Sequence, residues 1–249
     1  MEWIEAFYAR QDQLARVYSG PMADQDRERA HIISAALDGQ PGRVLEIGAG
    51  GGQSAQATAQ CGHDVTAIEL VPGSAAHARS LASRADPGSL RVLEGSFYTL
   101  TLAETFDLVC YWDGFGVGSD EDQRVLLRRI ADWLVPTGTA LIDINTPWYW
   151  ARAAGRQMSR ATFVRQYDFD ADACRLFDHW WSPQEPGERV TQSLRCYSPQ
   201  DLRLLLEGTG LILEHIEAGG ALDYDTGTWT ARVPLSQAMQ FRAHLRPLT

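Results

Sequence analysis

The chain has 249 residues, of which 45% are hydrophobic and 22% charged, values that suit a soluble globular protein and exclude a disordered one. This length accommodates one large domain, or one domain with an insertion. The formal net charge of −10, without any basic stripe in the sequence, argues against a nucleic-acid partner, which would require clustered cations.

The N-terminal part of the chain follows a strand–helix rhythm. Residues 1–38 are expected to form a helical segment, with helices over 2–18 and 24–37. Short apolar runs rich in β-branched residues then alternate with helical stretches, a pattern typical of βαβ units in a buried parallel sheet. Residues 39–147 are therefore assigned to an α/β core whose sheet is mostly parallel. Its predicted strands cover 43–48, 64–70, 90–95, 106–112 and 139–145.

Two later helices carry clear start signals. Ser119 followed by Asp122 resembles a capping box, and the apolar residues that follow lie on one helical face until Pro136. Ser198 with Asp201 repeats the device at the start of a second helix. Both segments are predicted to be short amphipathic helices packed on the sheet.

Residues 148–197 depart from this rhythm. They alternate with a period of about two around turn-like residues 170–172 and 186–187, which predicts two or three inserted antiparallel strands. The segment holds 10 of the 24 aromatic residues of the chain, about twice an even share. It is therefore interpreted as a hydrophobic cap over an acceptor or as a dimer surface. Residues 198–249 are expected to complete the core sheet with an antiparallel final strand, or to swap between subunits.

A glycine-rich loop follows the first predicted strand. Residues 44–54 read VLEIGAGGGQS, so an acid, Glu46, precedes three glycines spaced two apart, Gly48, Gly50 and Gly52. A strand, a glycine loop and a helix together present free backbone N–H groups to a ligand. The dinucleotide pattern GxGxxG would need glycine where Gln53 stands. An acid two residues before the first glycine suits a ligand with a positive group, although a structural pairing of Glu46 with Arg43 is the alternative.

Two further features occur in order after this loop. Glu69 ends the second predicted strand, 21 residues after Gly48. The segment FDLVCYWDGFG and the later LLRRIADWLVPTGTALIDI then supply a strand, a helix and a turn into the next strand. With these features, residues 43–146 resemble the class I (Rossmann-like) S-adenosylmethionine-dependent methyltransferases, in looser outline to about residue 217. The resemblance implies a Rossmann-like fold with S-adenosyl-L-methionine as cofactor.

The resemblance assigns roles residue by residue. Glu46 corresponds to the acid near the methionine ammonium, and Glu69 to the acid that accepts the ribose hydroxyls. Ser96 stands where the family commonly has an acid beside the adenine amine, which weakens that one contact. The remaining implied cofactor contacts are Gly48, Gly50, Gly52, Leu70, Gly95, Phe97, Tyr111 and Trp112.

Methyl transfer from a sulfonium mainly requires alignment and exclusion of water. Aromatic faces tolerate the dispersing positive charge through cation–π attraction. The expected substrate-binding residues are Tyr18, Trp112, Phe115, Trp148, Tyr149 and Trp180. As general bases for a hydroxyl or ammonium acceptor, His179, Tyr18 and Asp113 are predicted, with His179 preferred because imidazole accepts a proton near neutrality.

The predicted function is methyl transfer to N, O or C of a small acceptor with an aromatic or apolar body, in bacterial secondary metabolism. Methylation of an indole-like carbon without a strong base is one alternative. Metal-assisted O-methylation through Asp113, Asp143 and Asn145 is another, but no metal ion is predicted. A nicotinamide oxidoreductase and a protein that binds the cofactor without methylating are the alternatives from other classes.

The four cysteines, at positions 61, 110, 174 and 196, form no CxxC motif, which argues against a disulfide framework. The N-terminus lacks a basic and apolar signal, and no apolar run reaches ~18 residues. The expectation is a cytoplasmic protein without a membrane partner, with a homodimer as a possible assembly.

Overall fold

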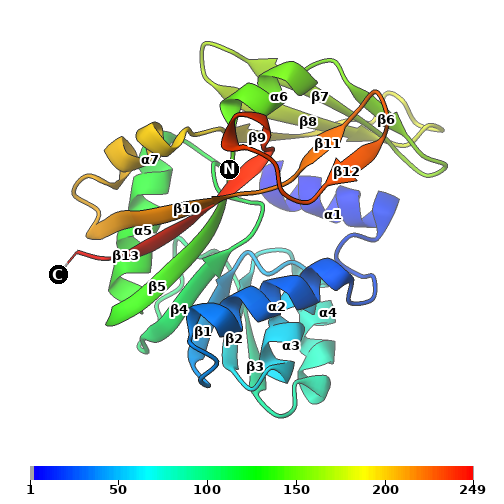
Figure 1. Cartoon of the computed structure of the whole chain (residues 1–249). Coiled ribbons are helices and arrows are strands. Elements are labelled where there is room, and N and C mark those ends of the chain that lie inside the picture. Colours follow the sequence, from blue (N-terminus) through cyan, green and yellow to red (C-terminus); the bar gives the residue numbers. More distant parts are fainter. Residues whose placement is uncertain (1–2, 249) are drawn as a thin grey trace.

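The computed structural model describes residues 3–248 and centres on a seven-stranded sheet in the order β10-β13-β5-β4-β1-β2-β3. Figure 1 shows this sheet with helices on both faces and a separate cap beyond one end of its strands. Only β13 runs antiparallel to its neighbours. The strands are β1 (Arg43–Ile47), β2 (Asp64–Glu69), β3 (Ser89–Glu94), β4 (Phe106–Tyr111), β5 (Leu134–Asn145), β10 (Leu211–Ala218) and β13 (Gln240–Pro247).

Two apolar clusters pack the helices on the sheet. On one face, buried leucines and isoleucines of α5 (Asp120–Trp133) and α7 (Pro199–Leu206) contact the strands. On the other face, α2 (Asp24–Ala36) and α3 (Gln53–Gln60) do so through small and aliphatic residues. α4 (Pro72–Leu81) and the short η1 (Ala82–Arg84) follow β2 and flank α3. The predicted Rossmann-like α/β fold is confirmed.

The strand predictions hold to within about a residue, except for β5. This strand begins at Leu134 and not at residue 139, because Leu134 pairs with Phe106 at an irregular point in the ladder. Both predicted capping boxes are present. The Ser119 hydroxyl accepts a hydrogen bond from the backbone N–H of Asp122 at 3.1 Å, and Ser198 accepts one from Asp201 at 3.1 Å.

The cap consists of a four-stranded antiparallel sheet and two helices. Residues 147–153 form the helix α6, where the sequence pattern suggested strand; Pro147 in the first turn fits a helix start. Four strands are present where two or three were predicted. The elements are α1 (Trp3–Ala15), α6 (Pro147–Ala153), β6 (Gln157–Ser159), β7 (Val164–Asp170), β8 (Arg175–Trp181) and β9 (Val190–Arg195).

α1 packs on the cap, not on the central sheet. Its buried Phe7 and Leu14 share an apolar cluster with Trp180 of β8. The N-terminal segment and the insertion, far apart in the sequence, thus form one layer above the strand ends (Figure 1).

The C-terminal part confirms the antiparallel final strand, β13, and adds a hairpin that the sequence did not predict. The hairpin comprises β11 (Ala221–Asp223) and β12 (Thr228–Thr230), and η2 (Leu235–Gln237) follows it. Trp229 lies on this hairpin and is 57% exposed. Within residues 3–248, no helix is both long and apolar enough to cross a bilayer.

The capping box at Ser119, at the start of α5, provides a test of local stability. Ser119→Ala should lower the free energy of unfolding by about 1 kcal/mol, because the N–H of Asp122 loses its acceptor. Ser119→Thr keeps a hydroxyl at the same place and should lose much less. Urea unfolding of both variants measures the difference; equal losses would show that the hydroxyl is not the cause.

Candidate functional site

The carboxyl ends of β1 and β2 meet at one edge of the sheet, because the two strands are parallel and paired in register. The loop from Gly48 to Gly52 leaves β1 there and leads into α3. Gly48, Gly50 and Gly52 have φ angles of 64°, 54° and 80°. This left-handed conformation favours glycine, which explains their alternate spacing.

The turn between α1 and α2 packs directly on this loop. A Cβ on Gly50 would lie 2.6 Å from the Tyr18 ring, and one on Gly51 would lie 1.7 Å from the Tyr18 carbonyl oxygen. The Gln53 side-chain amide donates to the carbonyl oxygens of Tyr18 and Gly20 at 3.2 and 2.9 Å. Gln53, which departs from the dinucleotide pattern, therefore fixes this turn over the loop.

Glu69 faces the same loop from the end of β2. Its carboxylate accepts hydrogen bonds from the backbone N–H groups of Gly50 and Val71, both at 2.7 Å. Burial raises the pKa of Glu69, while these N–H groups act in the opposite direction. The carboxylate is thereby aimed at the loop, where a ligand diol would lie.

Glu46 lies near the end of β1 and is only 2% exposed. Burial raises the pKa of Glu46 to about 8, and the nearby Arg29 acts against this rise. Among the described residues, its Oε2 has no hydrogen-bond partner. Arg43, the alternative partner, instead lies 4.0 Å from the Asp107 carboxylate. Glu46 thus holds an acceptor oxygen for a donor that the chain does not supply.

Asp113 follows β4, the neighbour of β1; the region beyond the carboxyl ends of β1, β2, β3 and β4 is called the crevice below. Its carboxylate is ion-paired with Arg29 and accepts a hydrogen bond from the side-chain amide of Gln240 at 3.0 Å. Burial alone would raise the pKa of Asp113, but Arg29 and these hydrogen bonds outweigh it and lower the pKa. With these contacts in place, 52% of the Asp113 side chain is still accessible to solvent.

Trp112 lies between two arginines beside Asp113. The guanidinium carbons of Arg29 and Arg242 lie 5.3 and 5.0 Å from its ring centroid, within cation–π range. Arg242 in turn holds Asp143 with two hydrogen bonds of 2.9 and 3.3 Å. This arrangement fixes the indole and occupies Asp143. A metal ion bound between Asp113 and Asp143 would have to displace both guanidiniums.

The loop after β3 completes the crevice on the side of β2. Gly95 donates its N–H to the Glu69 carbonyl oxygen at 2.8 Å, so Ser96 and Phe97 follow directly beside the end of β2. The Phe97 ring packs against Tyr111 with centroids 5.6 Å apart, and Tyr111 in turn lies against Gly48. Leu70 is half-buried directly after Glu69. The structure thus brings together the predicted cofactor residues of four strands.

The roof of the crevice comes from α1 and the cap; the sequence suggested a cap but not the contribution of α1. Tyr8 of α1 accepts a hydrogen bond from the Gln192 side chain of β9 at 3.1 Å, and its ring meets Tyr18 edge-on at 6.0 Å. Burial and the charges of Glu69, Asp113 and Asp178 raise the pKa of Tyr8 far above its ordinary value. The only signal in the sequence was the aromatic pattern WIEAFY, without indication of its partner 184 residues away.

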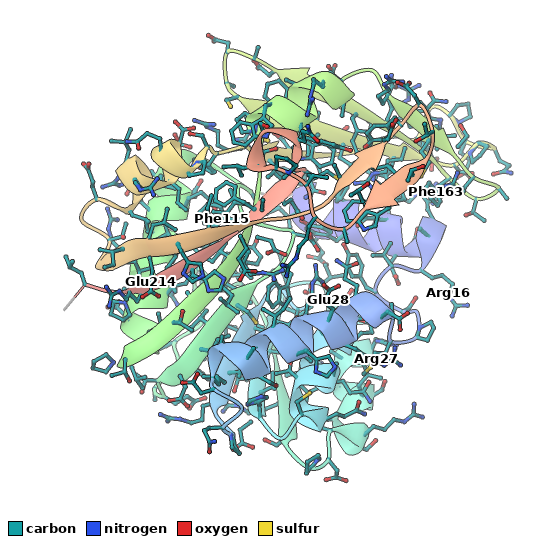
Figure 2. The ribbon with its side chains drawn as sticks, in the orientation of Figure 1. Arg16, Arg27, Glu28, Phe115, Phe163 and Glu214 are labelled. Carbon is teal, nitrogen blue, oxygen red and sulfur yellow. The ribbon has the colours of Figure 1, made fainter. Side chains whose placement is uncertain are left out.

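Several predicted residues lie elsewhere. The Nδ1 atom of His179 and the hydroxyl of Thr191 share a hydrogen bond of 2.8 Å. His179 lies on the face of β8 opposite to the buried Asp178, because side chains alternate along a strand. Phe115 is fully buried in the core against Tyr197 (Figure 2). Trp148 donates to the Leu235 carbonyl oxygen at 2.8 Å, and Trp180 stacks on Phe163 at the cap.

Tyr18 stays in the crevice, but its chemistry differs from that of a base. Burial raises the pKa of Tyr18 well above its ordinary value, and its hydroxyl donates to Gln11 at 2.7 Å. A phenol of this kind keeps its proton at neutral pH. Among the three predicted bases, only Asp113 presents an ionised group to the crevice.

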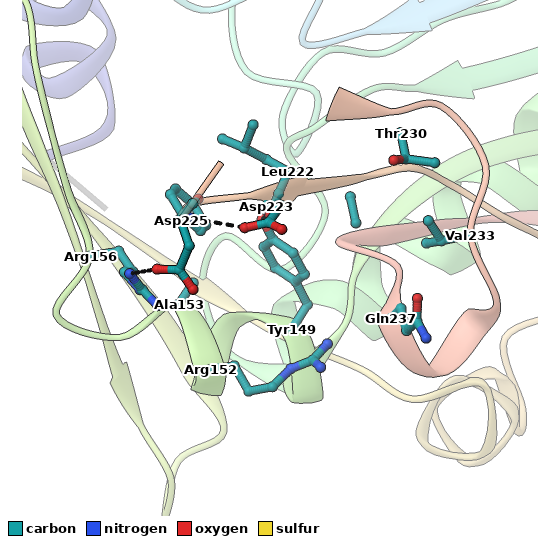
Figure 3. A pocket seen from close by; sticks show the side chains of 12 residues that line it. Tyr149, Arg152, Ala153, Arg156, Leu222, Asp223, Asp225, Thr230, Val233 and Gln237 are labelled. Atoms are coloured by element: carbon teal, nitrogen blue, oxygen red, sulfur yellow. Dashed lines mark hydrogen bonds and ion pairs between the residues drawn. The ribbon is translucent and has the colours of Figure 1, made fainter. Parts of the chain in front are cut away.

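A separate cavity of about 380 Å³ opens between α6 and the β11–β12 hairpin (Figure 3). Tyr149 lines it, and its hydroxyl donates to the Leu222 carbonyl oxygen at 2.9 Å. Arg156 and Asp225 form an ion pair of 2.6 Å at its rim. None of its lining residues belongs to the glycine loop or its acids, so this cavity is distinct from the crevice.

Residues 44–138 match the methyltransferase-domain family. Among curated proteins, the cypemycin N-terminal methyltransferase of Streptomyces sp is 33% identical over 121 residues, which cover 48% of this chain and 47% of that protein. Residues 44–138 are thus similar to a methyltransferase domain, which supports the expected class I S-adenosylmethionine-dependent methyltransferase. The sequence match spans about half the length of this curated relative.

Solved methyltransferase structures share the fold. The CcbJ methyltransferase of Streptomyces caelestis superposes with a TM-score of 0.74 at 23% identity and covers 98% of both chains. An S-adenosylmethionine-bound amino pentose methyltransferase of Micromonospora echinaspora gives a TM-score of 0.58 at 20% identity, over 91% of this chain and 92% of that one. The fold of this chain, the cap included, is therefore shared with these solved structures.

S-adenosyl-L-methionine is the cofactor of this family, and the crevice fits its chemistry. The unpartnered oxygen of Glu46 suits an ammonium, and the glycines at positions 48, 50 and 52 leave this part of the loop without side chains of its own. The carboxylate of Glu69 suits a ribose diol.

The raised pKa of Glu46 predicts a pH dependence of stability. In the folded chain the Glu46 carboxyl has a pKa of about 8 and keeps its proton below that pH. In the unfolded chain it loses the proton near the ordinary pKa of 4.5. Stability is therefore greatest below about pH 4.5 with respect to this group and falls as pH rises toward 8, by at most about 1.4 kcal/mol per pH unit. Glu46→Gln removes this contribution and should gain stability relative to the unchanged protein as pH rises.

Urea unfolding of the ligand-free protein at several pH values between 5 and 8.5 measures this difference. The control, Glu214→Gln on the surface of β10, should follow the unchanged protein. A difference between Glu46→Gln and the unchanged protein that stays constant with pH would contradict the raised pKa.

Proposed function

We propose that this chain transfers a methyl group from S-adenosyl-L-methionine to a nitrogen, oxygen or carbon atom of a small acceptor with an aromatic or apolar body, in bacterial secondary metabolism. The observation that carries the proposal is the unpartnered, buried oxygen of Glu46, beside a glycine loop that Glu69 faces from the next strand. Such a pair of acids suits a ligand with an ammonium at one end and a diol at the other.

Each part of the crevice has a proposed role in holding the cofactor. Glu46 would bind the methionine ammonium and Glu69 the ribose hydroxyls, while Gly48, Gly50 and Gly52 allow close approach to the backbone. The adenine would lie among Leu70, Gly95, Ser96 and Phe97, and the methionine portion beside Tyr111 and Trp112. The bound cofactor supplies an electrophilic methyl group on a sulfonium.

The aromatic side chains of the crevice would orient the reacting groups and exclude water. Trp112 forms part of the floor, and Tyr8 and Tyr18 form the roof, with their rings 6.0 Å apart. Aromatic faces attract a cation and need less desolvation than a carboxylate. Alignment with exclusion of water accounts for most of what a protein contributes to a displacement of this kind.

Among acceptor atoms, we favour an amine nitrogen. The charges of Glu69, Asp113 and Asp178 act on Tyr8, so carboxylates gather near the proposed acceptor side, where Arg29 pairs with Asp113 and Arg165 with Asp178. These negative charges attract a cationic amine and repel an anionic acceptor. Two of the similar proteins are described as an N-terminal methyltransferase and an amino pentose methyltransferase, which is consistent with this choice.

Asp113 is the favoured residue for contact with the acceptor. It is ionised, accessible and next to Trp112, so it can accept a hydrogen bond from an acceptor ammonium and hold it by charge, whereas its lowered pKa makes it a weak base. His179 and Tyr18, the other predicted bases, lack either the position or the pKa for this role.

The cofactor site is tested by calorimetry with S-adenosylhomocysteine. Glu69→Gln and Glu46→Gln should each weaken binding about ten- to a hundredfold, because each variant removes the charge from a hydrogen-bonded contact. The matched control is Glu214→Gln, an exposed acid on β10. Unchanged affinity in both crevice variants would show that the ligand is placed wrongly.

The acceptor site is tested by transfer of a labelled methyl group to a panel of amines, phenols and indoles. Asp113→Asn should reduce kcat/KM for an amine by about ten- to a hundredfold, as expected for a lost charge-assisted hydrogen bond to the acceptor, with little change in S-adenosylhomocysteine affinity. Asparagine tolerates the φ angle of 60° at this position, so the backbone should persist. An undiminished rate would remove Asp113 from the mechanism.

The same experiments distinguish the alternative functions. Tight S-adenosylhomocysteine binding without transfer to any acceptor would favour a binding protein. An absorbance change with NADH would favour an oxidoreductase, against which Gln53 counts, since its amide binds the Tyr18 carbonyl where the dinucleotide pattern needs glycine.

A further inference from the structure

Two histidines and a glutamate form a cluster on the edge of the central sheet, remote in the sequence from every motif of the crevice. His215 and Glu217 lie two residues apart on β10, so their side chains project from the same face. His244 of β13 is the direct cross-strand partner of His215. One ligand atom from each of the three residues lies within 4.8 Å of the other two.

The distances in this cluster suit ligands of one ion better than mutual hydrogen bonds. His244 Nε2 lies 3.4 Å from Glu217 Oε1 and, within the part of the chain that the structure describes, has no hydrogen-bond partner although it is buried. Two ligands of a tetrahedral zinc ion, with bonds of about 2.0–2.2 Å, lie roughly 3.4 Å apart. The two imidazole rings are stacked, with centroids 3.9 Å and planes 23° apart, so one ring must rotate about its Cβ–Cγ bond for both to direct a nitrogen at the same ion.

The surrounding charges leave the cluster free for a cation. Arg242, which faces Glu217 across the strands, is held by Asp143. Arg246 lies 3.7 Å from Glu214. Figure 2 shows Glu214 on β10 at the open edge of the sheet.

We propose that His215, Glu217 and His244 form a binding site for a divalent transition-metal ion of the zinc type. Zinc-type ions bind both imidazole nitrogen and carboxylate oxygen. Calcium and magnesium prefer oxygen ligands, so the two imidazoles favour an ion of the zinc type. Three protein ligands leave a fourth position for water. The ion would link the edge strand β10 to β13 and stabilise this edge of the sheet. Arg242, which also lies on β13, packs on Trp112.

The experiment titrates the metal-free full-length protein with Zn²⁺ by calorimetry and with Co²⁺ by visible absorption. One ion should bind per chain, and Co²⁺ should give the intense visible bands of a tetrahedral complex. The double variant His215→Ala/His244→Ala should weaken binding at least about a hundredfold, and Glu217→Gln about tenfold, because each removes a ligand. Zn²⁺ should raise the melting temperature of the unchanged protein but not of the double variant.

Three controls make the result decisive. His31→Ala removes an exposed histidine of α2 and should leave Zn²⁺ affinity unchanged. Cys61→Ser excludes the exposed cysteine as the ligand, and a Co²⁺–thiolate band would reveal it. Circular dichroism checks that each variant folds. Equal Zn²⁺ affinity in the double variant and the unchanged protein, or an octahedral Co²⁺ spectrum, would overturn the proposal without any bearing on methyl transfer.

Discussion

The crevice depends on the burial of Glu46 beside a loop without side chains. A carboxylate in this position is unfavourable unless a cation approaches it, and Arg29 is the cation that the chain brings nearest. Arg29, however, is ion-paired with Asp113 and stacked on Trp112, which leaves Oε2 of Glu46 without a donor among the described residues. The binding of a cationic ligand would supply that donor, so the unsatisfied state is a physical reason for ligand affinity.

The same constraint orders the elements around the crevice. Because the loop has only hydrogen atoms on its outer side, the Tyr18 turn can pack directly on it, and Gln53 fixes that turn. The turn places α1 under the cap, and α1 brings Tyr8 opposite the strand ends. The cap is therefore coupled to the nucleotide loop through a short chain of contacts, and a ligand at the loop would contact both layers.

Charge also separates the two ends of the site. The arginines near Trp112 are each neutralised by an aspartate, Arg29 by Asp113 and Arg242 by Asp143. Asp178 is likewise paired with Arg165, and Glu69 accepts two backbone N–H groups. Among these acids, Glu46 keeps an oxygen without a partner in the described residues, so its end of the site is the one that attracts a cationic group.

The sequence by itself determined the α/β fold, the positions of the first five strands in the chain, both capping boxes and the acids at the ends of β1 and β2. These features are local, because strand burial, glycine spacing and helix caps are read within a few residues of one another. The roles of Tyr8, Gln192, Arg29 and Arg242, the outward direction of His179, and the meeting of His215 with His244 were decided only by the tertiary structure. Each depends on which strands and helices become neighbours. Side chains alternate along a strand, but which of two adjacent side chains faces a site is settled only by the position of the neighbouring strand.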